Sequence, residues 1–253
     1  MRSLLAAAAL LLSPIAAAAE LPTQTRPVTL VELFTSQGCH SCPPADAVLA
    51  RLELDARNTD QPLAFLAFHV DYWNRLGWTD PFSDPAYSNR QRAYAQAFRS
   101  RTVYTPQMIV AGDREFVGSN ANAARQAIDA APDPNSSRAT IALRRLSLDG
   151  NTITIDADLS HIPRNAYLFA ALADGPHATP VPRGENAGKT LRESAVVRSL
   201  NLTDARPTTT LTLDLPPGID ADTARVVVWL QNPETMRIHH AVATTQRLAP
   251  DSG

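Results

Sequence analysis

Cys39 and Cys42 are the residues whose types and spacing point most directly to chemistry in this 253-residue chain. They are its only cysteines, and only His40 and Ser41 separate them. The run Val28–Phe34 before them suits a buried strand, and two prolines after them suit the first turn of a helix. A C-x-x-C pair at a helix N-terminus favours the thiolate, because the helix dipole is positive there. The pattern predicts Cys39 as a nucleophile, aided by protonated His40, and Cys42 as the thiol that resolves a mixed disulfide.

Two other interpretations of the same pair stay open. The cysteines could form an inert local disulfide, although disulfides that staple a fold usually close longer loops. They could also hold Cu(I) or a similar soft metal, with His40 or His69 as a further ligand. No Met-rich or His-rich tract accompanies them. Redox chemistry is the preferred interpretation, with no metal and no cofactor besides the Cys39–Cys42 disulfide.

Thr105-Pro106 precedes a predicted strand, at the point where a thioredoxin fold places a cis-proline beside its cysteines. An X-Pro bond is cis in only about 5–6% of cases in folded proteins, so this expectation rests on topology. Pro106 is predicted to be cis and close to the cysteines, with Thr105 the residue most exposed to the thiols. The neighbouring carbonyl and amide would dock the extended backbone of a substrate.

An aromatic segment, Asp71–Pro85, follows the second predicted strand and is expected to be a folded loop. Trp73 and Trp78 are predicted to wall a substrate groove or to cap the core. Trp78 is expected to be buried and Trp73 to lie nearer the surface. His69 could be oriented by Asp71, since both share one face of an extended segment, but a hydrogen-bonded core histidine is the commoner case.

The elements that must position these residues alternate in the first half of the chain. Apolar runs predict buried strands, and apolar positions at helical spacing predict helices. Gly112-Asp113 is expected to turn a hairpin. The expected order is strand, helix, strand, helix, two strands and helix. These elements are expected at Val28–Phe34, Ala45–Leu54 (after Pro43 and Pro44), Leu63–Val70, Ala86–Ser100, Gln107–Ala111, Arg114–Val117, and from Ser119 or Asn120 to Ala131.

The second half changes to strands after the turn-rich linker at residues 132–137, and no helix signal separates them. Clean apolar alternation and a hairpin turn at Asp149-Gly150 indicate an antiparallel, sandwich-like unit. His239 and His240 alternate across a strand and are expected to be structural. The expected strands are Ala139–Leu148, Thr152–Leu159, Ala166–Ala173, Leu191–Leu202, Thr208–Leu215, Ala224–Gln231 and Ile238–Arg247.

The N-terminus and the overall charge limit where the protein works. Residues 1–19 have a basic start, a short apolar run and an Ala-rich cleavage pattern, which predict a signal peptide. Residues 20–27 are expected to be an exposed lead-in. No later run approaches the length of a membrane span. With a net charge of −2 and no basic cluster, nucleic acid is not an expected partner. A periplasmic or secreted location is expected.

Four strings resemble a secreted bacterial family known as domain of unknown function 1223, which is placed in the thioredoxin-like superfamily. The similarity extends over Val28 to His240, including the loop Gly184–Thr190, which is expected to be an exposed connection unless it touches the thiol region or a partner. The strings are VELFTSQGCHSCPPAD (Val31–Asp46), FHVDYWNRLGWTDPFS (Phe68–Ser83), RQRAYA (Arg90–Ala95) and VYTPQMIV (Val103–Val110).

The resemblance implies a thioredoxin-like domain, which the element order places at residues 28–131. With the all-β sandwich-like domain that the strand pattern predicts at residues 138–248, the expected fold class is α/β. Thioredoxins bury an acid in the strand before C-x-x-C, and Glu32 lies seven residues before Cys39. Glu32 would pass protons to Cys42 if it is buried beside it, or is a salt-bridged carboxylate. The expected function is thiol–disulfide exchange with protein thiols or disulfides, or with a redox partner protein. The alternatives are a soft-metal chaperone and a partner-binding protein with a permanent disulfide.

Overall fold

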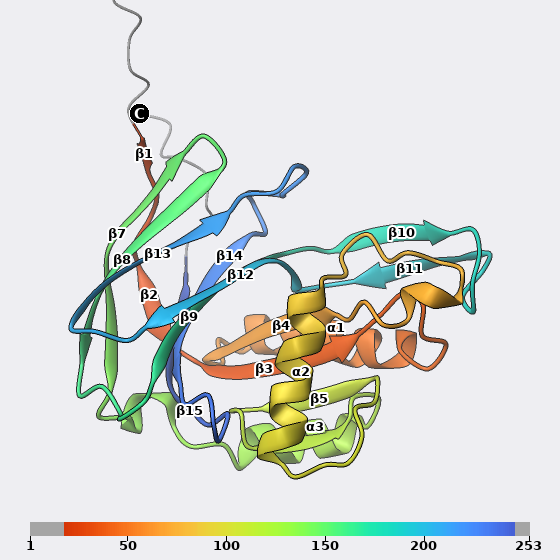
Figure 1. Cartoon of the computed structure of the whole chain (residues 1–253), viewed down its shortest axis with the longest axis horizontal. Coiled ribbons are helices and arrows are strands. Elements are labelled where there is room, and N and C mark those ends of the chain that lie inside the picture. The colour runs from red at the N-terminus through yellow and green to blue at the C-terminus, as the bar shows by residue number, and fades with distance from the viewer. Residues whose placement is uncertain (1–17, 246–253) are drawn as a thin grey trace, which may run out of the picture.

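The computed structural model describes residues 18–245, which fold into a larger sheet, a smaller sheet, a two-stranded hairpin and three α-helices. The larger sheet has nine strands in the order β2-β15-β14-β9-β12-β4-β3-β5-β6 (Figure 1). Its strands are β2 (Thr25–Pro27), β3 (Thr29–Thr35), β4 (Leu63–His69), β5 (Gln107–Val110), β6 (Arg114–Val117), β9 (Tyr167–Asp174), β12 (Val196–Asp204), β14 (Arg225–Gln231) and β15 (Ile238–Thr244).

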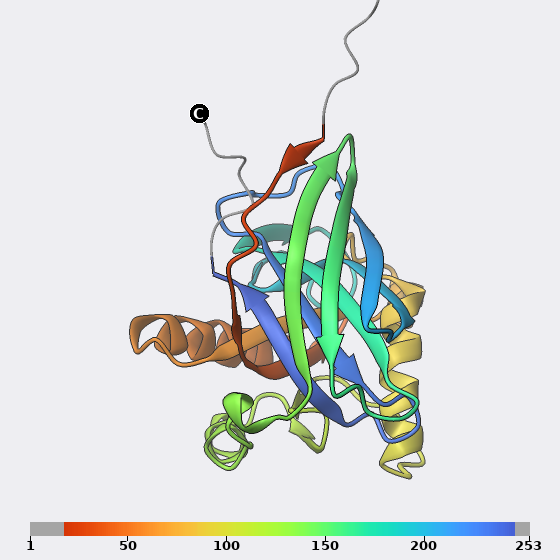
Figure 2. The same cartoon turned by 90° about the vertical axis from the view of Figure 1, so that its left-hand side faces the viewer.

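The smaller sheet covers one part of the larger sheet. It has the order β1-β7-β8-β13, and Figure 2 looks onto it. Apolar side chains that alternate along β7 and β8 pack against β9 and β14, which form the facing layer of one hydrophobic core. The strands are β1 (Ala19–Glu20), β7 (Thr140–Asp149), β8 (Thr152–Ser160) and β13 (Thr208–Asp214), and the separate hairpin is β10 (His177–Val181) with β11 (Lys189–Glu193).

The three helices lie on the two faces of the β4-β3-β5 region. Helices α1 (Pro43–Asn58) and α3 (Ala121–Asp129) bury apolar side chains on one face, and α2 (Pro85–Ala97) covers the other (Figure 2). Pro85 stands in the first turn of α2, where the Asp84 carboxylate accepts the N–H of Ala86 at 2.7 Å. Short 3-10 turns lie at Asn74–Leu76 and Pro134–Ser136.

The predicted fold class, an α/β thioredoxin-like domain followed by an all-β sandwich-like unit, is wrong. Of the described residues 41% are in strands and only 19% are helical. The nine-stranded sheet also runs through both halves of the chain, since Val196 of β12 pairs in parallel with Ala67 of β4. An apolar strand buried on both faces looks the same in sequence whatever strand lies next to it, so this continuation left no local signal. The boundaries at residues 28–131 and 138–248 stay a prediction.

Individual elements agree more closely with the sequence. The hairpin turn at Asp149-Gly150 is confirmed, with a positive φ of 56° at Gly150. The expected strand Leu191–Leu202 is instead two strands, β11 and β12, and β10 had no predicted counterpart. The predicted lead-in contains β1 and β2, and Leu21 is buried. Residues 1–17 of the predicted signal peptide lie outside the described residues. No helix within residues 18–245 has the length and apolar character to cross a membrane.

Candidate functional site

Cys39 and Cys42 form a disulfide at the start of α1, with Cα atoms 5.4 Å apart. Cys42 is the N-cap residue, and prolines occupy the first helical positions, as predicted from the sequence. The N–H groups of Ala45 and Asp46 both donate to the Cys42 carbonyl, which closes the first turn. Both cysteines are fully buried, at 0% exposure. A thiol that attacks this disulfide therefore needs a local opening of the structure around it.

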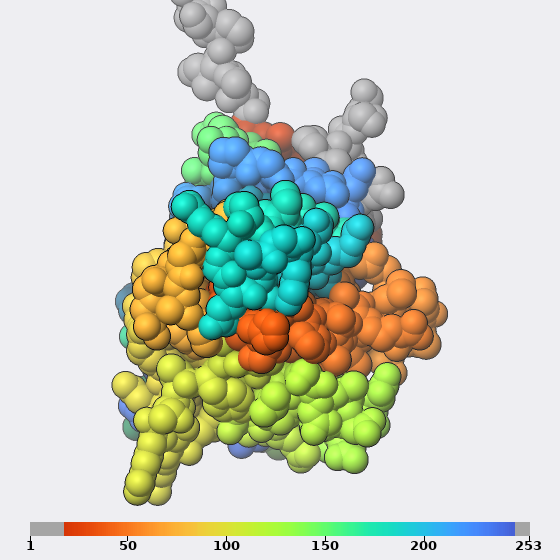
Figure 3. Space-filling model, turned by 90° about the vertical axis from the view of Figure 1, so that its right-hand side faces the viewer, coloured from red at the N-terminus to blue at the C-terminus, as the bar shows by residue number. Residues whose placement is uncertain are grey.

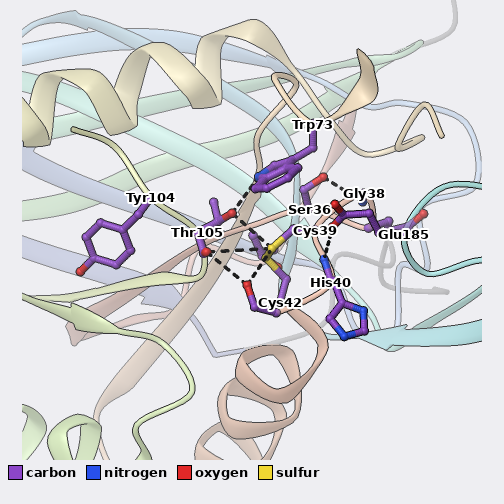
Figure 4. The surroundings of a disulfide bond; sticks show 12 residues. Ser36, Gly38, Cys39, His40, Cys42, Trp73, Tyr104, Thr105 and Glu185 are labelled. Atoms are coloured by element: carbon purple, nitrogen blue, oxygen red, sulfur yellow. Dashed lines mark hydrogen bonds between the residues drawn. A yellow bond between two sulfur atoms is a disulfide. The ribbon is translucent and has the colours of Figure 1, made fainter. Parts of the chain in front are cut away.

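Thr105 and Ser41 supply the polar groups next to the Cys39 sulfur (Figure 4). The Thr105 hydroxyl donates to Sγ at 3.3 Å, and Ser41 Oγ lies at the same distance. The Trp73 indole N–H donates to Thr105 Oγ1 at 2.8 Å. Because an indole nitrogen can only donate, the Thr105 oxygen accepts from Trp73 and its own proton remains available for the sulfur.

The Thr105–Pro106 bond is cis, as predicted. The Thr105 carbonyl lies 4.0 Å from Cys39 Sγ, and Ser41 Oγ contacts the same carbonyl at 3.5 Å. The Pro106 carbonyl accepts the N–H of Gly118 at 3.0 Å. The structure therefore brings Thr105, two residues before β5, into contact with Cys39 and Ser41 of the turn before α1.

The aromatic loop places both predicted tryptophans beside the cysteine turn. Trp78 donates its indole N–H to Gln37 Oε1 at 2.9 Å, while Trp73 donates to Thr105. A Cβ at Gly38 would lie 3.0 Å from the Trp73 Cβ, so the close approach of the loop needs a glycine there. Both tryptophans are half-buried, which corrects the expectation that Trp78 alone is buried. Their role in substrate binding stays a prediction.

His69 is a buried residue whose partner is Asp80, not Asp71. Its Nδ1 lies 2.8 Å from Asp80 Oδ2, and the same oxygen accepts the N–H of Gln37 at 2.7 Å. Burial acts to lower the His69 pKa, but the Asp80 carboxylate outweighs it and raises that pKa to about 9. Burial likewise opposes ionisation of Asp80, yet His69 and backbone N–H groups hold its pKa below the usual value. The pair ties β4 to the turn before Cys39.

Asp46 is a buried acid on α1 that the sequence did not single out. It lies four residues after Cys42, and such pairs share one helix face with the later side chain directed back toward the earlier one. Its Oδ1 accepts the Thr35 hydroxyl at 2.7 Å. Burial raises the Asp46 pKa to about 7. Asp46 is therefore a buried carboxyl, one helical turn from Cys42, whose pKa lies close to neutral pH.

Glu193, at the end of β11, completes the buried polar group next to α1. Burial raises its pKa, and it interacts electrostatically with His69, Asp80 and Asp46. Two buried atoms here, His69 Nε2 and Ser194 Oγ, have no hydrogen-bond partner among the described residues. No group of three or more His, Cys, Asp or Glu side chains within residues 18–245 is arranged to hold a metal ion.

Glu32 lies on the other face of β3, away from the contacts of the cysteines. Arg90 Nε donates to its Oε1 at 2.7 Å, and the Tyr94 hydroxyl donates to its Oε2. This placement corresponds to the salt-bridged alternative for Glu32. Side chains alternate along a strand, so Glu32 and Thr35 lie on opposite faces of β3, and the acid that bonds Thr35 is Asp46 of α1.

The loop between β10 and β11 contacts the cysteine turn instead of being only an exposed connection. Glu185 Oε2 accepts the backbone N–H of His40 at 3.0 Å. Asn186 is fully buried and donates to the carbonyls of Gln37 and Cys39. The His40 ring is exposed. The string GENAGKT belonged to the resemblance, but nothing local in it predicted these contacts.

The fold and the site define a mostly β protein with a buried C-x-x-C disulfide at the start of a helix. The sequence profile of a family described as "Protein of unknown function (DUF1223)" matches residues 30–231. The chain therefore belongs to this family of unknown function.

Among solved structures, the chain is similar to a protein from Agrobacterium tumefaciens determined by X-ray crystallography in a structural genomics programme. The two are 24% identical, the alignment covers 90% of this chain and 97% of that one, and the TM-score is 0.62. At this identity the likeness extends to the fold alone. No curated protein matches the chain.

Proposed function

We propose that this protein is an exported thiol–disulfide exchange protein that acts on protein thiols or disulfides through Cys39 and Cys42. The observation that carries the proposal is the Thr105 hydroxyl, which Trp73 orients and which donates to Cys39 Sγ at 3.3 Å. Together with the N-terminus of α1, this donor favours a negative charge on Cys39 when the disulfide is reduced. A disulfide with only a structural role needs no hydrogen-bond donor directed at its sulfur.

The exchange can be written with named groups. A client thiolate attacks Cys39 Sγ, the Cys39–Cys42 bond breaks, and Cys42 leaves as a thiolate. We assign the delivery of a proton to Cys42 to Asp46, which lies one turn along α1 and has a pKa of about 7. A second client thiolate then attacks the client sulfur of the mixed disulfide and releases Cys39. Two electrons pass from the client dithiol to the protein, and the reverse sequence oxidises Cys39 and Cys42.

The aromatic loop gives this proposal a place for a client. Trp73 and Trp78 are half-buried beside the cysteine turn, where they contact Thr105 and Gln37. We assign their exposed faces to the apolar side chains of a protein client. The predicted export fits this activity, since disulfides persist in oxidising compartments.

A second candidate is a binding protein with a permanent disulfide. It is favoured by the 0% exposure of both cysteines, since a sulfur that solvent does not reach resists attack in the closed structure. Against it, a bridge across so short a loop constrains the unfolded chain by only about 2 kcal/mol in the chain-entropy account.

Equilibration of the folded protein with glutathione buffers separates these candidates. Mass spectrometry after acid quenching and alkylation would count the free thiols at each ratio of reduced to oxidised glutathione. We expect a reversible transition that corresponds to a potential between about −270 and −120 mV. A disulfide that stays fully oxidised, with a potential below about −300 mV, would contradict exchange and support the permanent bridge.

Two additions sharpen this experiment. In Cys42→Ser the resolving thiol is absent, so Cys39 should accumulate a mixed disulfide with glutathione, whereas Cys39→Ser should form little of it. Elemental analysis of the protein as purified tests the soft-metal alternative. Stoichiometric copper bound to the reduced pair, together with no glutathione equilibrium, would favour a chaperone.

A further inference from the structure

The loop between β10 and β11 connects the second half of the chain to the cysteine turn. Figure 3 views this face, where the cyan segment of the loop adjoins the dark-orange segment around the cysteines. Asn186 donates to the Gln37 carbonyl at 2.9 Å and the Cys39 carbonyl at 3.0 Å, which uses both its N–H bonds. Its own carbonyl accepts Lys189 Nζ at 2.9 Å. Asn186 therefore holds the loop and the turn in one fixed arrangement.

The neighbouring glycine allows this close approach. Gly184 has a φ of +81°, a conformation that favours glycine. A Cβ at this position would lie 3.1 Å from the Cβ of Trp78, so the loop also packs tightly on the aromatic segment. The contacts of Gly184 with Trp78 and of Asn186 with the cysteine turn therefore fix the position of Glu185, which lies between them in the sequence.

Glu185 places a carboxylate against the backbone N–H of His40, the residue that follows Cys39. Its Oε2 accepts the backbone N–H of His40 at 3.0 Å (Figure 4). Two consequences follow for a reduced Cys39. The carboxylate repels a thiolate on the adjacent residue, and it occupies a backbone donor that could otherwise turn toward the sulfur. The other titratable groups around this turn are the ring of His40, the ammonium of Lys189, and the buried His69, Asp80, Glu193 and Asp46.

We propose that Glu185 is a positioning residue that disfavours the Cys39 thiolate and thereby stabilises the disulfide over the dithiol. This inference rests on the proposed exchange function and deepens it, because it gives the second half of the chain a role in setting the redox equilibrium. Thr105 donates to the sulfur and favours the thiolate, whereas Glu185 acts in the opposite direction from across the site. The redox potential of the Cys39–Cys42 pair then depends on the balance between these two opposing effects.

The substitution Glu185→Gln tests this inference, since it keeps the size and one acceptor oxygen but removes the charge. The pH dependence of iodoacetamide alkylation at Cys39 is measured on protein reduced beforehand with dithiothreitol. We expect the midpoint to move down by about half to one pH unit, and alkylation below the midpoint to accelerate roughly three- to tenfold. The glutathione equilibrium should move toward the dithiol, because a stabilised thiolate favours the reduced form.

Glu234→Gln is the matched control. Glu234 is exposed in the turn between β14 and β15, and its substitution changes the net charge by the same amount. An unchanged midpoint in Glu185→Gln, or an equal shift in Glu234→Gln, would overturn the inference. The alkylation measurement uses pre-reduced protein, so it reports on Glu185 even if the native disulfide does not equilibrate with glutathione. Failure of that equilibrium in the wild-type protein would overturn the exchange function separately.

Discussion

Two buried clusters of charged side chains lie on opposite faces of β3, and they differ in how fully their polar atoms are paired. On the α2 face, Arg90 donates to Glu32, to Gln231 and to the Tyr94 hydroxyl. The guanidinium also lies 5.1 to 5.4 Å from the centroids of four aromatic rings. Because Gln231 belongs to β14, this cluster joins the two halves of the chain through satisfied contacts.

The cluster on the α1 face is incompletely paired. Asp46 and the His69–Asp80 pair have partners, but His69 Nε2 and Ser194 Oγ have none among the described residues. Unpaired polar atoms in a buried site cost stability, so each needs an explanation. The satisfied cluster is explained by its role in holding the fold together. The incomplete cluster lies next to the helix that carries the disulfide, and the proposed exchange gives its acids a use as proton donors and acceptors.

The largest effect is expected from breaking the satisfied cluster. Arg90→Ala removes one partner of a buried ion pair and leaves the Glu32 charge uncompensated, which should lower the free energy of unfolding by about 3–5 kcal/mol. Urea denaturation measures this change. Arg164→Ala, at an exposed arginine, should stay within about 0.5 kcal/mol of the wild-type value. Equal stabilities of the two variants would contradict the structural role of the α2 cluster.

The incomplete cluster should make stability depend on pH. Asp46 has a folded pKa of about 7 against an ordinary value of 3.8, so its contribution is fully present below about pH 4 and is lost as the pH rises through 7. The His69 contribution is present below about pH 6.5 and is lost as the pH rises through 9. The contribution of this cluster to the free energy of unfolding should therefore fall from acidic toward alkaline pH across these two windows.

The variant Asp46→Asn isolates the first window. It should remove the decrease in the free energy of unfolding between about pH 4 and 7. For a single proton this decrease is at most about 1.4 kcal/mol per pH unit. Asp129→Asn, at an exposed position on α3, is the matched control. The free energy of unfolding is measured by denaturation at several pH values. If it changes with pH in the same way in wild type and Asp46→Asn, the assignment of this window to Asp46 is contradicted.

A smaller effect is expected at Thr105. Thr105→Val keeps the shape of the side chain but removes the hydroxyl that donates to Cys39 Sγ. Alkylation of the reduced protein at pH 7 should slow by about tenfold, since a hydrogen bond to the thiolate is lost. Thr105→Ser retains a hydroxyl and should preserve the rate within about threefold. A Val variant that reacts like the wild type would show that this donor does not act on the thiolate.

The smallest effect should come from the indole that orients this hydroxyl. Trp73→Phe keeps an aromatic ring but loses the N–H donated to Thr105, so the hydroxyl is less firmly directed at the sulfur. We expect Cys39 alkylation at pH 7 to slow about two- to threefold. Trp78→Phe, which loses a bond to Gln37, should leave the rate unchanged. Equal rates of Cys39 alkylation in both variants would contradict the proposal that Trp73 acts on Cys39 through Thr105.

The sequence predicted what depends on local patterns. Cys42 before a helix that starts with prolines and the strand Arg114–Val117 carry signals within a few neighbouring residues. The cis bond at Thr105–Pro106 was predicted from the order of the elements before it, which the first half of the chain keeps. The fold class failed because it depends on which distant strands pair, and the β12–β4 contact has no local signature.

The site shows the same limit. Asp46 had a usable signal, since an acid one turn after Cys42 interrupts an otherwise apolar helix face. Asp80, Glu193 and Asn186 reach the cysteine turn from loops and from the second half of the chain. Only the tertiary structure brings these three residues together with it.

The most direct test of the central claim is the titration of the Cys39 thiol itself. The dithiothreitol-reduced protein is alkylated with iodoacetamide across a pH series, and mass spectrometry assigns the modified cysteine at each time point. We expect Cys39 to react before Cys42, with a midpoint well below the ordinary thiol value of about 8.5. A midpoint at or above that value, or faster reaction of Cys42, would contradict the account.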